Sequence, residues 1–169
     1  MIKIFINHNM KRIKKIGLVL PNIPGYSETF FYSKINGLQE NGYTIKLFVN
    51  HKKKNGYPEK WKVYVQPRVN QPNVLLIPKM IWKIITSFVL RPANVVRYWK
   101  LGAKDQIPIR KRMENLYINS HILVQRLDWL HFGFATMALR RENVAKAIEA
   151  RMAVSLRGYD ISIFPLKHP

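Results

Sequence analysis

The chain has 169 residues, a length that fits one domain and leaves no room for a second. Of these residues 47% are hydrophobic and 12% are aromatic, which is enough apolar surface for a packed core. Its 29 Lys and Arg residues outnumber 9 Asp and Glu residues, and the resulting formal charge of +20 predicts an anionic partner: nucleic acid, a membrane surface or a phosphorylated ligand. The absence of cysteine excludes a disulfide framework and a thiolate metal site, and it favours a reducing compartment such as the cytoplasm.

Two segments of the sequence bear on membrane topology. Residues 1–14 form a basic lead-in without the long apolar run and cleavage site of a secretory signal. Residues 74–90 are the longest apolar stretch, but Pro78, Lys79 and Lys83 interrupt it. We therefore expect a segment that can lie on a membrane and not one that crosses it.

The first part of the chain has the pattern of a β-α-β unit. Residues 16–20 (IGLVL) are continuously apolar and are followed by prolines and a glycine, which indicates a buried parallel strand and a loop. A helix is expected from an N-cap at Ser27 to Gly42, because apolar residues recur there at helical spacing. Residues 44–49 (TIKLFV) predict the next strand.

The middle of the chain is harder to interpret. Residues 61–66 alternate between apolar and polar side chains and predict a third strand. From about residue 72 to residue 125 the pattern is helical but irregular, with breaks expected at Pro78, Pro92 and Pro108. We interpret this segment as a helical insert in a larger α/β domain.

The last part predicts a second β-α-β unit. Residues 127–132 and 153–156 have strand patterns, and residues 134–152, which are rich in small packing residues, predict one helix between them. The two units together predict an α/β fold: a Rossmann-like, open and mostly parallel sheet with flanking helices.

Three loops follow predicted strands and therefore should meet at one edge of this sheet. They comprise residues 21–29, 131–133 and 157–160. In an open α/β sheet, ligands bind outside the carboxyl ends of the strands. The polar residues of these loops are the candidates for a functional site.

The same three loops resemble motifs of a known family. Residues 24–30 (PGYSETF) with 38–42 (LQENG), then 130–133 (LHFG) and 155–160 (SLRGYD), occur in the order and at the distances seen in family-four glycosyltransferases of bacterial exopolysaccharide synthesis, such as that of colanic acid. The resemblance spans roughly residues 15–169, and the middle third matches poorly.

This resemblance implies the GT-B fold, in which two Rossmann-like domains face each other across a cleft. It implies retaining transfer from a nucleotide-diphosphate sugar without a bound metal or other cofactor, and the sequence has no Asp-x-Asp pair. Residues 15–169 would be the N-terminal, acceptor-side domain. Because the C-terminal donor domain is absent from the 169 residues, we expect a fragment that is inactive alone.

The resemblance also implies which residues line the cleft. His131 is the candidate catalytic residue, and the other cleft candidates are Gly25, Tyr26, Ser27, Glu28, Arg157 and Asp160. Each has a structural alternative: His131 could pack at a strand end, Gly25 could serve a tight turn, and Ser27 and Glu28 could cap the helix. Arg157 and Asp160 could form plain salt bridges, with each other or with neighbouring residues. The other histidines show no metal-site spacing.

The excess of basic residues lies beside aromatic residues. The cations include residues 52–54 and 110–112, Arg91, Arg97, Lys100 and Lys104, and the aromatics are Trp82, Phe88, Tyr98 and Trp99. This mixture suits an anionic membrane interface, and a lipid-linked glycan acceptor would place the protein on the cytoplasmic membrane face. Nucleic acid is the alternative partner, but it leaves the three loop motifs unexplained. Part of the segment could instead be a surface that faces the absent second domain.

Overall fold

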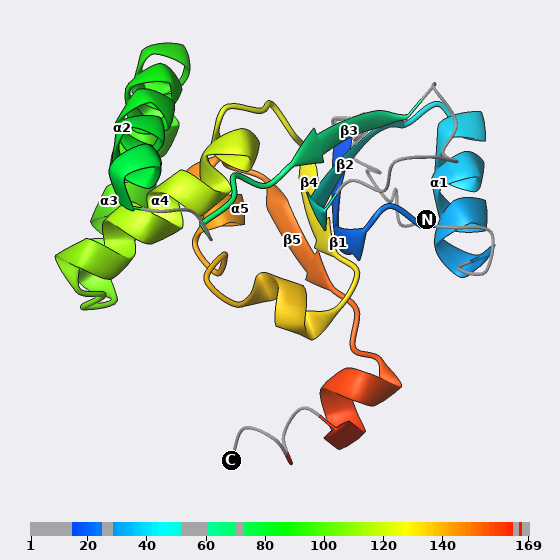
Figure 1. Cartoon of the computed structure of the whole chain (residues 1–169). Coiled ribbons are helices and arrows are strands. Elements are labelled where there is room, and N and C mark those ends of the chain that lie inside the picture. Colours follow the sequence, from blue (N-terminus) through cyan, green and yellow to red (C-terminus); the bar gives the residue numbers. More distant parts are fainter. Residues whose placement is uncertain (1–14, 25–28, 52–60, 70–72, 164–165, 167–169) are drawn as a thin grey trace, which may run out of the picture.

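One parallel sheet organises the domain. The computed structural model describes residues 15–24, 29–51, 61–69, 73–163 and 166. The strands are β1 (Lys15–Asn22), β2 (Thr44–His51), β3 (Lys62–Val65), β4 (Trp129–Phe132) and β5 (Arg151–Val154). They are parallel throughout and lie in the order β3-β2-β1-β4-β5 (Figure 1). This order confirms the predicted Rossmann-like α/β fold.

Helices cover both faces of the sheet. The described helices are α1 (Thr29–Glu40), α2 (Asn73–Leu90), α3 (Pro92–Lys104), α4 (Ile109–Leu123) and α5 (Val144–Ala147), with the short turns η1 (Ala135–Ala138) and η2 (Tyr159–Ile163). Figure 1 shows α1 on one side of the sheet and α2, α3 and α4 on the other. Helix α2 packs against α3 and α4. Within the described residues, no helix has the length and apolar character needed to cross a membrane.

Alternating side chains of the central strands pack into two hydrophobic cores, one on each face of the sheet. On one face, Leu18 of β1 and Leu47 of β2 pack with Ile35 of α1. On the other face, Val19 and Phe48 pack with residues of α3, α4 and α5. Because a parallel strand in this position is buried on both faces, its sequence is continuously apolar, as residues 16–20 are.

The end of β4 makes a close approach to β1 and α1. The Gly133 N–H donates to the carbonyl of Val19 at 2.9 Å. A Cβ at position 133 would lie 2.3 Å from Cδ2 of Leu20 and 2.9 Å from the ring of Phe31, both of which are buried. Only glycine therefore allows the chain to leave β4 in contact with α1.

The prediction of a single helix over residues 134–152 is wrong. The segment consists of η1, a turn and α5, and β5 begins at Arg151 and not at residue 153. The helix is interrupted because Arg140 and Glu149 adopt left-handed backbone conformations, with φ of 64° and 59°. These conformations depend on contacts with distant parts of the chain, which local periodicity does not reveal.

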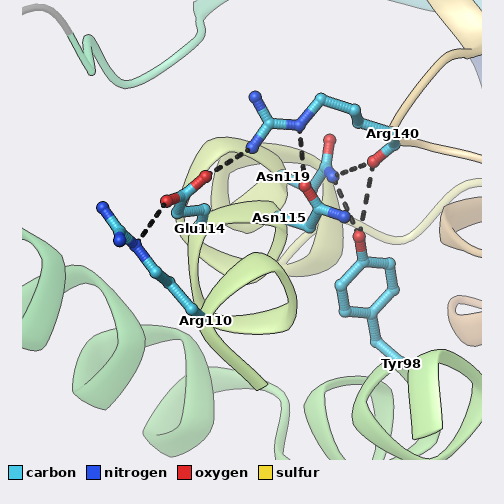
Figure 2. A network of polar contacts seen from close by, with 6 residues as sticks. All are labelled: Tyr98, Arg110, Glu114, Asn115, Asn119 and Arg140. Atoms are coloured by element: carbon cyan, nitrogen blue, oxygen red, sulfur yellow. Dashed lines mark hydrogen bonds and ion pairs between the residues drawn. The ribbon is translucent and has the colours of Figure 1, made fainter. Parts of the chain in front are cut away.

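A polar network holds the turn at Arg140 (Figure 2). The Arg140 carbonyl accepts hydrogen bonds from Nδ2 of Asn119 at 2.8 Å and from the Tyr98 hydroxyl at 3.5 Å, while its Nε donates to Asn115 at 2.8 Å. Its guanidinium also pairs with Glu114, which contacts Arg110. Burial raises the pKa of Tyr98 to about 12, so this hydroxyl remains a donor at all ordinary pH values.

The three prolines of the helical segment behave differently from one another. Pro92 is the first residue of α3, and Pro108 immediately precedes α4, so both mark helix starts as expected. Pro78 lies inside α2 and does not end it, which contradicts the predicted break. Packing of α2 against α4 and α3 outweighs the one backbone hydrogen bond that the proline removes.

The close approach at Gly133 gives the first testable prediction. Gly133→Ala should lower the free energy of unfolding by about 1–3 kcal/mol, because the added methyl must displace Cδ2 of Leu20 and the Phe31 ring. Gly37→Ala is the matched control: apart from the backbone of its own helix and its chain neighbours, no atom lies within 4 Å of an added Cβ, and alanine in a helix interior should raise stability by about 0.5–1 kcal/mol. Urea unfolding measures both, and equal effects would contradict the account.

Candidate functional site

His131 lies near the carboxyl end of β4 and connects two other elements. Its side chain projects from the face of the sheet that α1 covers, since its neighbours Leu130 and Phe132 belong to the opposite core. The Nδ1 atom is 3.0 Å from Nζ of Lys34 on α1, and Nε2 is 2.8 Å from the hydroxyl of Ser155, just after β5. The half-buried imidazole therefore bridges α1, β4 and the segment after β5.

These contacts define the protonation state of His131. Burial, and then the positive charges of Lys34 and Arg157, lower the pKa of His131 to about 4. The ring is neutral near pH 7. An ammonium group can only donate, so Nδ1 accepts from Lys34, and the ring hydrogen resides on Nε2 and is donated to Ser155. In this tautomer His131 cannot take a proton from Ser155, which excludes a serine nucleophile activated by this contact.

Arg157 lies beside this cluster and is held by aromatic rings. Its guanidinium carbon is 4.3 Å from the ring centroid of Phe31, 4.7 Å from that of Phe30 and 5.1 Å from that of Phe134. Its Nε donates to the Gly133 carbonyl at 3.2 Å. These contacts orient the planar guanidinium through cation–π attraction.

Asp160 fixes the loop that carries Arg157. Its two carboxylate oxygens accept from the backbone N–H groups of Arg157, at 3.0 Å, and of Thr136, at 3.3 Å. The side chain is only 8% exposed. Asp160 thus bonds to the backbone of Arg157 and not to its guanidinium, so the plain salt bridge considered as an alternative is not formed.

The structure brings part of the predicted site together. His131, Arg157 and Asp160 lie around the carboxyl ends of β4 and β5, as their loops indicated. The other cleft candidates lie outside the described residues: Gly25, Tyr26, Ser27 and Glu28. Helix α1, which follows them, contributes Phe30 and Lys34 to the cluster.

Two residues of the cluster were missed from the sequence. Lys34 gave no signal beyond its place between the buried Phe31 and Ile35 on α1. Ser155 belongs to one of the quoted motifs. Alternation along β5 could have identified it, because Ala153 pairs with His131 and a residue two positions further along a strand lies on the same face.

Arg141 connects the neighbouring strand ends through hydrogen bonds. Arg141 is 5% exposed, and its guanidinium donates to the Met137 carbonyl at 2.8 Å, to Asn50 of β2 at 3.1 Å and to Gln66 after β3. Burial, and then the adjacent Arg140, lower its pKa to about 10. Because both terminal nitrogens of the guanidinium donate inside the protein, we assign Arg141 to holding the edge of the sheet in place, although its buried Nε has no partner among the described residues.

The charge arrangement favours an anionic ligand. Burial, and then the charge of Arg157, lower the pKa of Lys34, which shows that the two cations repel each other. Among the described residues, neither forms an ion pair with a carboxylate. An anion placed between them would relieve this repulsion.

Two further observations concern metal binding and the location of the site. In the described part of the chain, no group of three His, Cys, Asp or Glu residues could hold a metal ion. An open cavity of about 850 Å³ lies at the opposite edge of the sheet, where Lys15 begins β1 and Asp128 precedes β4. We place the candidate site at the carboxyl edge because the motif residues converge there.

Comparison of the chain with models of protein families, with curated proteins and with solved structures finds no match. The class of the protein that the fold itself defines is a Rossmann-like α/β domain. Its functional interpretation rests on the geometry of the site and on the three motifs.

The neutral state of His131 predicts a pH dependence of stability. The unfolded chain binds a proton at His131 near pH 6.5, whereas the folded protein does so only near pH 4. The free energy of unfolding should therefore fall as the pH drops between these values. His121, whose pKa burial lowers to about 3, adds to the same trend.

His131→Gln should remove one of these two contributions. Melting temperatures measured from pH 7 to pH 4.5 should fall less steeply for the variant than for the unmodified protein. Parallel curves for the two proteins would show that His131 titrates alike in the folded and unfolded states, against the geometry described.

Proposed function

We propose that this chain is the acceptor-side domain of a retaining glycosyltransferase. It would bind a lipid-linked glycan that receives a sugar from a nucleotide-diphosphate donor in bacterial surface polysaccharide synthesis. The observation that carries the proposal is the convergence of Lys34, His131 and Arg157 at the carboxyl edge of the sheet. His131 and Arg157 belong to two of the three motifs that resemble this family, and Phe30, over which the Arg157 guanidinium lies, is the last residue of the other.

The cluster offers a specific way to bind such an acceptor. Lys34 and Arg157 supply positive charge for a diphosphate, and Arg157 presents a guanidinium oriented by aromatic rings. The Ser155 hydroxyl accepts from Nε2 of His131 and keeps its own hydrogen for a sugar or phosphate oxygen. His131 thereby contributes a polar but uncharged surface to the proposed binding site.

The chemistry of transfer would rest on positioning and electrostatics. In the family that the motifs resemble, the donor's nucleotide lies on a second domain, so we assign only the acceptor side to the described residues. A neutral imidazole and two fixed cations can orient an acceptor and stabilise developing negative charge without themselves changing protonation. His131 is our candidate for the residue nearest the reacting hydroxyl.

We further propose that the protein is peripheral on the cytoplasmic face of the cell membrane. The formal charge of +20 would attract it to anionic lipids. A lipid-linked acceptor gives this location a purpose, because enzyme and substrate would then share the same surface.

Binding of a soluble acceptor analogue tests the proposed site. A short-chain prenyl diphosphate carrying one sugar should bind the full chain, and Arg157→Gln should raise its Kd about tenfold, the effect of losing one charge-assisted hydrogen bond. Isothermal titration calorimetry measures both values.

Arg126→Gln is the matched control for this experiment. It makes the same change of charge at an exposed position just before β4, at the opposite edge of the sheet. Its Kd should equal that of the unmodified chain. Equal weakening by the two variants would show that net charge alone attracts the ligand, and the site would be refuted.

A non-enzymatic module that binds nucleic acid is the alternative, and the same +20 charge favours it. Gel shifts with single- and double-stranded nucleic acid and sedimentation with anionic vesicles, at about 50 and 200 mM salt, separate the two functions. We expect vesicle binding that persists at the higher salt. Tight nucleic-acid binding without affinity for vesicles would favour the alternative.

A further inference from the structure

Helix α2 exposes an unusually apolar outer side. Apolar side chains that are at least half exposed recur along it, with Trp82 at 67% and Val89 at 73%, and Leu90 at the end of the helix is exposed on a different side. The outer side consists of Ile77, Ile81, Trp82, Ile85, Phe88 and Val89. At 3.6 residues per turn these positions fall within an arc of roughly 140° that contains no charged residue. Soluble proteins rarely expose a contiguous apolar patch of this kind without a binding partner.

Basic residues border this outer side. Lys79 and Lys83 lie along one flank of the apolar arc, and Arg91 follows the last residue of α2. The opposite side of the helix packs on α3 and α4, where Ser87 is buried. An apolar face flanked by lysines, with a tryptophan near its border, is typical of helices that lie in the plane of a membrane interface.

An apolar groove adjoins the same side. It has a volume of about 350 Å³ between α2, α3 and α4, and its lining includes Ile84, Phe88, Val96, Trp99 and Met113. Among the described residues that line it, Lys100 alone is charged. Phe88 belongs both to the groove and to the outer side of α2, so the two form one continuous apolar surface.

We infer that this surface, the outer side of α2 with its adjoining groove, inserts into the boundary between headgroups and acyl chains of an anionic bilayer. The groove accepts hydrocarbon, while Lys79, Lys83 and Arg91 meet lipid phosphates. This inference rests on the proposed membrane location and names the element responsible for it. Charge complementarity selects lipid over a protein partner, since the apolar surface is bordered by cations on a chain of net charge +20.

The placement of α2 is compatible with the candidate site. Helix α2 lies on the side of the sheet opposite α1 (Figure 1), and His131 projects from the α1 face. A bilayer against α2 therefore leaves the cluster of Lys34, His131 and Arg157 uncovered.

Vesicle sedimentation of the full chain tests the inference. The vesicles contain phosphatidylglycerol and phosphatidylcholine and no glycan, so binding does not depend on an acceptor. The double variant Ile81→Glu/Ile85→Glu should reduce the partition coefficient at least about tenfold, because two charges would enter the apolar boundary. The control Ile109→Glu/Leu139→Glu introduces the same charges at exposed apolar positions away from α2 and should bind almost as the unmodified chain does.

A second measurement covers the case in which the double variant fails to fold. Brominated lipids should quench the fluorescence of Trp82 and of Trp99, which lines the groove, so Trp82→Phe should reduce the quenching and leave the part that comes from Trp99. Unchanged quenching in Trp82→Phe would place α2 outside the bilayer and overturn the inference.

The outcomes separate this inference from the proposed function. Vesicle binding that both double variants retain equally would refute the role of α2 and leave membrane association standing. Failure of the unmodified chain to bind vesicles would refute the membrane location as well. If Ile81→Glu/Ile85→Glu binds vesicles as the unmodified chain does but no longer self-associates, the surface is an interface between protein copies and the inference is overturned. Arg157→Gln, which tests the acceptor site, should leave vesicle binding intact.

Discussion

The imidazole of His131 is held from two sides by side chains that are far from it in sequence. Lys34 donates to one ring nitrogen and Ser155 accepts from the other, so α1, β4 and the start of the segment after β5 meet at one ring. The contact requires the chain to leave β4 close to α1, which Gly133 permits. It also requires β5 to pair in a register that places Ala153 beside His131 and Ser155 just beyond it.

This contact determines the electrostatics of the whole edge. A ring that is half-buried between cations stays uncharged, and the positive charge resides on Lys34 and Arg157. Arg157 is in turn positioned by three phenylalanine rings and by a loop that Asp160 clamps through backbone N–H groups. The result is a neutral imidazole beside two cations, the arrangement on which the proposed binding of a sugar diphosphate rests.

Much of the fold could be predicted from the sequence because its central strands are buried on both faces. Such strands have continuous apolar sequences, which identified β1 directly, and the apolar residues of TIKLFV indicated β2. The segment after β4 could not be predicted in the same way. Its turn at Arg140 is stabilised by Tyr98 and Asn119, and these partners become visible only once the chain is folded.

The site was predictable to a similar and limited degree. The rule that ligands bind at the carboxyl ends of parallel strands placed His131, Arg157 and Asp160 at one edge, and the structure has them there. Lys34 was missed because its importance depends on a contact across 97 positions of the sequence. Local patterns carry no information about which lysine of a strongly basic chain will face a particular histidine.

The central claim is that His131 is a neutral residue, fixed by Lys34 and Ser155, at a site for an anionic glycan. Nuclear magnetic resonance of the ¹⁵N-labelled imidazole tests it most directly, by titrating the full chain with acid and then adding a prenyl-diphosphate-linked sugar at pH 7. The account predicts a ring protonated at Nε2 alone until the pH falls to about 4, with resonances that shift when the glycan binds. An imidazole that titrates near pH 6.5 and does not respond to the glycan would contradict it.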